Sequence, residues 1–476
     1  MNFRWSSIKY MNLSLGRSQS HGVKLPGVRL QWSLVAVLIF LPLRLFSSPT
    51  ATAAYFLLAV FALTGRAQAI QALALSWLFS MLSSAVAPDV PLAALGRYVV
   101  LAGAALSVLL RAGRGTSSSR VPVKRLVLAT LLLGFGIVAH ALLFSAVRDV
   151  SVLKAASWTV AVATLLSAWS ALSAEARQRL ERQLFGGLVV LMLASLPMVA
   201  RGSGYLVNGS GFQGVLSHPQ AFGPTMALLA AWLASRILAE TRPPWRLVGL
   251  FVIALVLIVL SEARTAGLGL MLGLLVAIAA GRLLAGQRLG DYMPGLRSRR
   301  VQLTMGLGLL AVIAVGPLLG NKVAMFVAKR GSSYNVVEAY DRSRGRKVDE
   351  MWTNIREHPI RGIGFGVASD PFSMEVARDP VLGLPTGASI EKGVLYLAIW
   401  EELGLMGLMA VLAWLLLLIR RAALGGMTPL AVCLTALIMN LGEAMLFSPS
   451  GFGMLVLILV TWAASSTRGS VGLARA

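Results

Sequence analysis

The chain has 476 residues, of which 57% are hydrophobic and only 13% are charged, and its mean hydropathy is +0.76. Soluble domains carry about 25% charged residues, so this composition excludes an ordinary soluble protein. The formal net charge is +24, but the cations lie in short connections between apolar stretches. This pattern is typical of the positive-inside rule and predicts no nucleic-acid partner. A single cysteine, Cys433, excludes an intrachain disulfide and a cysteine-based metal site.

Apolar stretches of about 20 residues, the length that a membrane helix needs, recur along almost the whole chain. They are continuous rather than alternating, so they predict helices and not the strands of a β-barrel. The expected fold class is an all-α integral membrane protein, a polytopic bundle of about 14 (12–14) transmembrane helices with one large extracytoplasmic loop. The predicted spans are 30–46, 50–64, 67–87, 92–110, 126–146, 152–172, 184–200, 220–239, 247–262, 266–284, 301–320, 403–419, 429–447 and 451–466.

Clusters of basic residues in alternate connections predict the orientation. With regular crossings they fall on the same side as the basic N-terminus, so that side is expected to be cytoplasmic. No small-residue cleavage pattern follows the first apolar stretch, which predicts an uncleaved first span. The expected organisation is a cytoplasmic tail (1–29), a transmembrane bundle (30–320), a large extracytoplasmic loop (321–402), C-terminal helices (403–466) and a cytoplasmic tail (467–476).

Several cations face outward in this topology. Arg148 and Lys154 flank an outer turn, Arg201 ends a span, and Arg264 sits between two apolar stretches. A charge at a helix end is often a snorkelling interfacial residue, whereas a charge at the bilayer centre costs about 2.5–3.5 kcal/mol and usually marks a function or an ion pair. Guanidinium groups match phosphate oxygens. The pattern therefore fits a lipid-linked phosphate or pyrophosphate, and equally an anion transporter.

Three stretches carry recognisable motifs. Residues 346–366 (RKVDEMWTNIREHPIRGIGFG) combine basic residues, a tryptophan and a Pro-x-x-Gly-x-Gly turn. Residues 261–265 (SEART) and 214–220 (GVLSHPQ) lie at the starts of two predicted spans. Taken in chain order (214–220, 261–265, 346–366), and with a large loop before the last spans, the stretches resemble the motifs of bacterial O-antigen ligases and Wzy-type polysaccharide polymerases. The resemblance covers roughly residues 185–420.

This resemblance implies a membrane glycosyltransferase on the outer face of the bacterial cytoplasmic membrane. The enzyme would join a polyprenyl-pyrophosphate-linked oligosaccharide to an acceptor glycan or glycolipid, with membrane lipid as its surroundings. We expect no cofactor and a metal-independent reaction. Membership of an envelope-assembly complex stays open, as does the alternative function of a flippase or transporter for lipid-linked oligosaccharide or another anion.

The end of the large loop departs from the ligase pattern. Tyr396-Leu397 and the stretch from Glu402 to Gly407 match it, but Gly393 stands at the position of the ligase histidine. Gly211 stands where the family has an arginine before the His-Pro motif. These departures favour a polymerase-like or divergent member over a lipid A-core ligase.

The candidate site residues follow from the outward-facing cations and from the resemblance to the family. Arg264 and Arg201 are predicted to bind the pyrophosphate, and further contacts to it or to the glycan are assigned to Arg361, Arg356 and Arg346. For a general base we predict His218 first and Glu391 second. His218 precedes Pro219 and would equally serve as a helix cap.

Overall fold

The computed structural model describes residues 32–112, 121–207, 209–285, 293–307, 310, 345–379, 382–388, 390 and 392–466. Some sequence predictions lie outside the described residues: the two tails, 1–29 and 467–476, most of the span 301–320, the segment 321–344 of the large loop, and Glu391.

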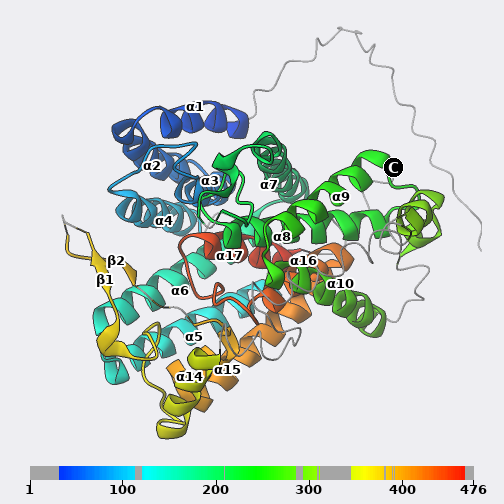
Figure 1. Cartoon of the computed structure of the whole chain (residues 1–476). Helices are drawn as coiled ribbons and strands as arrows, with labels where there is room; N and C mark the ends of the chain where they lie inside the picture. Colours follow the sequence, from blue (N-terminus) through cyan, green and yellow to red (C-terminus); the bar gives the residue numbers. More distant parts are fainter. Residues whose placement is uncertain are drawn as a thin grey trace, which may run out of the picture.

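The described chain is mostly α-helical (Figure 1). Before residue 286 the helices are α1 (Trp32–Phe46), α2 (Ser48–Leu63), α3 (Arg66–Met81), α4 (Ala93–Leu110), α5 (Val121–Phe144), α6 (Arg148–Ala171), α7 (Ala174–Ser195), α8 (Pro219–Ala239), α9 (Trp245–Leu260) and α10 (Arg264–Ala285). Later helices are α14 (Arg346–Glu357), α15 (Leu395–Gly425), α16 (Met427–Met439) and α17 (Phe452–Ser465). Short 3₁₀ helices are η2 (Leu196–Met198), η3 (Gly202–Tyr205), η4 (Pro294–Arg297) and η6 (Pro371–Ser373). Strands β1 (Val376–Arg378) and β2 (Pro385–Ala388) pair as an antiparallel hairpin.

A helix occupies every predicted span from 30–46 to 266–284 and from 403–419 to 451–466. Within the described residues, six helices are long and apolar enough to cross a membrane: Ala93–Leu110, Val123–Phe144, Arg148–Ala171, Ala174–Met198, Pro219–Ala239 and Leu395–Gly425. The other apolar helices are shorter. The fold is therefore consistent with an all-α membrane protein, while the number of crossings and the side on which the large loop lies stay predictions.

Two of the helix boundaries that differ from the predicted spans are set by polar contacts. The helix α7 begins at residue 174, ahead of the span predicted from 184, and the hydroxyl of Ser173 caps it by accepting the amide of Ala176 at 3.2 Å. The helix α16 ends before Asn440, whose side-chain oxygen accepts the amides of Met445 and Leu446, both at 2.9 Å. Hydropathy alone detects neither kind of cap.

The helix α17 lies in the middle of the bundle, with α3, α6, α15 and α16 packed against it (Figure 1). Each of its residues is buried. The outer helices, in contrast, turn bulky apolar side chains outward. On α5 these are Leu128, Leu131, Leu132, Phe135, Leu142, Leu143 and Phe144. An apolar stripe of this kind is unfavourable in water, and it fits a helix surface that faces lipid.

Contacts between helix ends agree with a chain that runs back and forth through the bundle. At one end, Arg44 donates to the carbonyl of Pro88 at 2.8 Å, and Asp149 pairs with Arg378 at 2.6 Å. At the other end, Arg111 donates to the carbonyl of Leu63 at 2.7 Å. We call the end that carries α14, β1 and β2 the loop end. The candidate site lies there.

Candidate functional site

The helix α15 is broken at Gly404, and the segment 359–366 docks into the break. Gly404 has a φ of 68°, so the backbone leaves the helical path and the carbonyls of Glu401 and Glu402 lose their usual helical donors. The docked segment replaces them. The amide of Ile363 donates to the carbonyl of Glu401 at 2.9 Å, and the amide of Gly364 donates to that of Glu402 at 3.0 Å. A Cβ at position 404 would collide with the carbonyl of the docked segment's residue 360.

This docking joins two of the stretches singled out in the sequence. The Pro-x-x-Gly-x-Gly turn (359–364) and the Glu-x-Gly-x-x-Gly stretch (402–407) supply each other's missing backbone partners. They therefore form one structural unit at the loop end.

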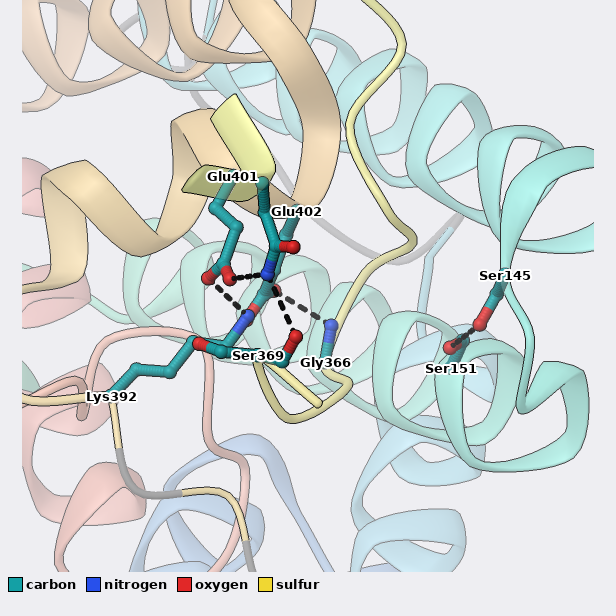
Figure 2. Close-up of polar contacts among 8 residues, drawn as sticks. Ser145, Ser151, Gly366, Ser369, Lys392, Glu401 and Glu402 are labelled. Carbon is teal, nitrogen blue, oxygen red and sulfur yellow. Dashed lines mark hydrogen bonds and ion pairs between the residues drawn. The ribbon is translucent and has the colours of Figure 1, made fainter. Parts of the chain in front are cut away.

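A buried charge cluster lies beside this unit (Figure 2). The ammonium of Lys392 is 2.7 Å from a carboxylate oxygen of Glu401 and 3.3 Å from one of Glu402, and the three side chains are only 2%, 0% and 7% exposed. The Asn354 amide donates to the other oxygen of Glu401 at 2.7 Å, and the Gly366 N–H donates to Glu402 at 2.6 Å. Buried charges need such partners. The cluster therefore ties α14, residue 366 and residue 392 to α15.

The first cavity, of about 280 Å³, adjoins this cluster and is lined by cations from three separate elements: Arg97 of α4, Lys154 of α6, and Lys392. Lys392 is neutralised by its two glutamates. In the part of the chain that the structure describes, neither Arg97 nor Lys154 forms an ion pair. Among the described residues, these three cations stand against the two carboxylates of Glu401 and Glu402, and this excess of positive charge favours an anion.

Lys154 is held in place by the docked segment. Its ammonium lies 5.2 Å from the centre of the Phe365 ring, in a cation–π contact. Its aliphatic stem passes Gly366 so closely that a Cβ there would lie 2.5 Å from the Lys154 Cδ. With its φ of 68°, Gly366 is suited to this conformation and approach. The glycine thus leaves the ammonium free to line the first cavity.

The second cavity, of about 760 Å³, lies next to the first. Arg97, Thr386 and Gly387 line both cavities, so one arginine and strand β2 stand at their junction. The hairpin is anchored by the ion pair between Arg378 and Asp149 and by the Tyr98 hydroxyl, which donates to the carbonyl of Pro385 at 3.4 Å. Both anchors lie on helices that also line the first cavity.

The arginines predicted from the sequence lie elsewhere at the loop end. Arg264 is the first residue of α10 and is partly buried, and its amide donates to the carbonyl of Glu262 at 3.1 Å. Arg201 is exposed and precedes η3. Neither lines the first or the second cavity, so their binding of pyrophosphate stays a prediction.

The three loop arginines are also outside both cavities. Arg346, Arg356 and Arg361 are exposed on α14 and the turn after it. Arg346 lies 3.7 Å from Glu350 in an i,i+4 ion pair, and Arg361 lies 3.3 Å from a ring nitrogen of His358. Such contacts between exposed side chains contribute little to stability. Because all three side chains are exposed, they are accessible to a ligand.

The two predicted bases have different outcomes. His218 caps α8: its Nδ1 accepts the amide of Gln220 at 3.0 Å, which confirms the capping alternative. Burial lowers the pKa of His218 below its usual value, so the capping lone pair is retained at neutral pH. Glu391 lies outside the described residues, but Ile390 and Lys392, on either side of it, both line the first cavity.

Sequence reasoning missed Arg97 and gave Lys154 no specific role. A usable signal existed for Arg97, since it is the sole charged residue in the predicted span 92–110, and a charge within a span commonly marks a function. For Glu402 the motif gave the position but not its ion pair with Lys392.

No protein-family model matches this chain, and no curated protein does either. The resemblance of its motifs to the ligase and polymerase family therefore remains a prediction from the residues themselves.

Proposed function

We propose that this protein is a membrane glycosyltransferase of the O-antigen polymerase or ligase type. It would transfer an oligosaccharide from a polyprenyl pyrophosphate to an acceptor glycan or glycolipid at the outer face of the membrane. One observation carries the proposal. The two motif stretches that resemble the family form a single unit by docking at Gly404, and this unit lines the first cavity opposite Arg97 and Lys154, which form no ion pair among the described residues.

The chemistry of the first cavity suits a diphosphate. The guanidinium of Arg97 offers several fixed N–H donors, and the ammonium of Lys154 adds a point charge. In a partly buried site, such preorganised cations stabilise developing negative charge more than they would in water. A departing polyprenyl pyrophosphate develops that charge, so these cations would lower the barrier of the transfer.

The proposed reaction is a substitution at the anomeric carbon. The oxygen of an acceptor hydroxyl forms the new bond to that carbon, and the bond from the carbon to the phosphate oxygen breaks. Its electron pair leaves with the diphosphate, whose charge is offset by Arg97 and Lys154. The hydroxyl proton passes to water on the exposed side of the second cavity, where Ser84 and Asp89 lie at the surface.

The alternative of a flippase needs a polar route through the whole bundle. At the end opposite the loop end, Arg111, Arg177 and Arg300 donate to the backbone carbonyls of Leu63, Ser465 and Pro243. Those guanidinium groups are engaged in holding helix ends together, which favours the enzyme over the flippase.

Binding of undecaprenyl pyrophosphate to the purified protein in lipid nanodiscs tests the proposal without knowledge of the glycan. The variants are Arg97→Gln and Lys154→Met, with Arg148→Gln as the matched control, because Arg148 is an exposed cation of α6 that lines neither cavity. A hydrogen bond to a charged group contributes about 1.5–3 kcal/mol, so each site variant should bind about 10- to 100-fold more weakly.

The control should bind like the wild type. Wild-type protein that binds undecaprenyl pyrophosphate no more tightly than undecaprenol would contradict the proposal. So would site variants that match the control.

A further inference from the structure

The second cavity differs from the first in the groups that it offers a ligand. Its walls carry the hydroxyls of Ser80, Ser83, Ser84, Ser217 and Thr386, the amide of Gln213, the carboxylate of Asp89, and the guanidinium groups of Arg44 and Arg97. The second cavity thus offers mostly hydroxyl, amide and carboxylate groups, whereas the first offers mainly cations.

Part of this lining is already committed to the fold. Arg44 is 5% exposed and donates to the carbonyls of Phe79 and Pro88, at 3.1 Å and 2.8 Å. Gln213 is 1% exposed, and its side chain accepts the amide of Val207 at 3.1 Å and donates to Ser83 at 3.4 Å. These two residues form the wall rather than a contact for a ligand.

Other groups remain free to bind. Within the described residues, the side chains of Asp89, Ser84 and Ser217 make no hydrogen bond or ion pair, and Asp89 and Ser84 are exposed. Asp89 offsets the charge of Arg44, with which it interacts electrostatically, so among the described lining residues Arg97 at the junction supplies the excess positive charge and the rest of the second cavity offers a phosphate little attraction. The carboxylate and the serine hydroxyls suit a ligand rich in neutral hydroxyls, which donate to the carboxylate and both donate to and accept from serine.

The junction with the first cavity restricts the ligand further. Arg97 lines both cavities, so a ligand in the second cavity can lie directly beside an anion in the first. A sugar attached to a diphosphate has this layout, with a hydroxyl-rich part next to a charged part. The volume of about 760 Å³ falls in the range of about 300–1,000 Å³ that ligand pockets show.

We propose that the second cavity is a saccharide site, which holds an oligosaccharide through Asp89, Ser84 and Ser217 while Arg97 faces its phosphate-bearing end. This inference rests on the proposed function for its connection to the diphosphate. Its own ligand class, a neutral oligosaccharide, follows from the second cavity alone. The oligosaccharide belongs either to the donor or to the acceptor, and binding measurements distinguish the two.

The test compares the wild type, Asp89→Ala, and Glu357→Gln as a control that removes an exposed carboxylate of α14 outside both cavities. The probe is the set of oligosaccharides that mild acid releases from the surface polysaccharide of the cells that make this chain. Bare undecaprenyl pyrophosphate and the undecaprenyl-pyrophosphate-linked oligosaccharide from the same cells are measured beside it. Dissociation constants are determined for the whole protein in nanodiscs.

We expect Asp89→Ala to weaken saccharide binding about 10-fold or more, since it removes a hydrogen bond to a charged group, and to leave bare undecaprenyl pyrophosphate unaffected. Weaker binding of the lipid-linked oligosaccharide assigns the second cavity to the donor's sugar. Weaker binding of the free oligosaccharide alone assigns it to the acceptor.

The saccharide site is overturned if the wild type binds no oligosaccharide in either form, or if Asp89→Ala binds both as the control does. The proposed function has a separate failure. If undecaprenyl pyrophosphate does not bind while Asp89→Ala still loses the free oligosaccharide, the diphosphate site is wrong and the saccharide site stands.

Discussion

The amide of Leu405 donates to the carbonyl of Pro359 at 2.9 Å, across the break in α15. In an unbroken helix this amide would bond within α15, whereas here it shares the Pro359 carbonyl with the indole N–H of Trp400, which donates at 3.2 Å. The hydrogen bond therefore joins the large loop to the start of a long apolar helix. Because the docked segment also packs Phe365 and Gly366 against Lys154, the same joint sets the wall of the first cavity.

Gly404→Ala should disrupt this joint. The combination of φ 68° and ψ −176° is essentially restricted to glycine and costs an L-residue about 1–3 kcal/mol, and the collision of the new Cβ with the Ile360 carbonyl adds to that cost. We expect a clear fall in the melting temperature in detergent. Gly186→Ala is the matched control: Gly186 is helical and exposed with free space around it, so alanine should be neutral or stabilise by roughly 0.5–1 kcal/mol. Equal melting temperatures for the two variants would count against the docking.

Lys392 and Lys154 should respond differently to the same substitution. Lys392→Met leaves the carboxylates of Glu401 and Glu402 buried without a cation, which typically costs about 3–5 kcal/mol. Lys154→Met removes a cation with no ion pair among the described residues, so it should spare the fold and weaken the binding of undecaprenyl pyrophosphate. Thermal melting and ligand binding of both variants check this division. Similar losses of stability in both would show that Lys154 is also structural.

His218 gives a pH dependence with a defined sign. Its pKa is lowered by burial from the ordinary 6.5, so the unfolded chain binds more protons than the folded protein. The stability contribution is complete above pH 6.5 and is lost as the pH falls through the lower folded pKa. His218→Asn keeps a capping side chain without this titration, whereas His218→Ala should cost about 1 kcal/mol.

Melting temperatures between pH 5 and pH 8 check the prediction. The wild type should lose more stability than His218→Asn on acidification. A wild-type profile parallel to that of the asparagine variant would mean that the cap does not titrate in this range.

The ion pair between Asp149 and Arg378 should position the hairpin without stabilising the whole protein. Both side chains are nearly half exposed, at 46% and 48%, and exposed pairs contribute at most about 1 kcal/mol. In a double-mutant cycle with Asp149→Asn and Arg378→Gln, the coupling energy should stay below about that value. Amide hydrogen exchange of β1 and β2 should nevertheless rise in either variant. Unchanged exchange would show that the contact of Tyr98 with Pro385 suffices to hold the hairpin.

The helices were predictable from sequence because continuous apolar stretches have few alternatives in a membrane. The predicted span 403–419 even begins one residue before the break at Gly404, although α15 itself starts at residue 395. The extra turns contain Glu401 and Glu402, which hydropathy excludes from a span. Their burial depends on Lys392, and no local pattern reveals that pairing.

The candidate site was less predictable for the same reason. Arg97, Lys154 and Lys392 come from α4, α6 and the end of the large loop, and only the packing of these elements brings them to one cavity. The motifs directed attention to exposed cations such as Arg361, whose neighbours in the sequence match the family pattern. The sequence could name the docked turn, but not the side chains on the opposite wall.

The most direct test of the central claim is turnover by the purified protein. Undecaprenyl-pyrophosphate-linked oligosaccharide from the cells that make this chain is the substrate, and Lys154→Met and Arg148→Gln are assayed beside the wild type. We predict that saccharide is transferred to an acceptor with release of undecaprenyl pyrophosphate, that Lys154→Met is slower by about 100-fold or more, and that Arg148→Gln is as active as the wild type. Wild-type protein that leaves the substrate intact, or moves it unchanged across a liposome membrane, would contradict the account.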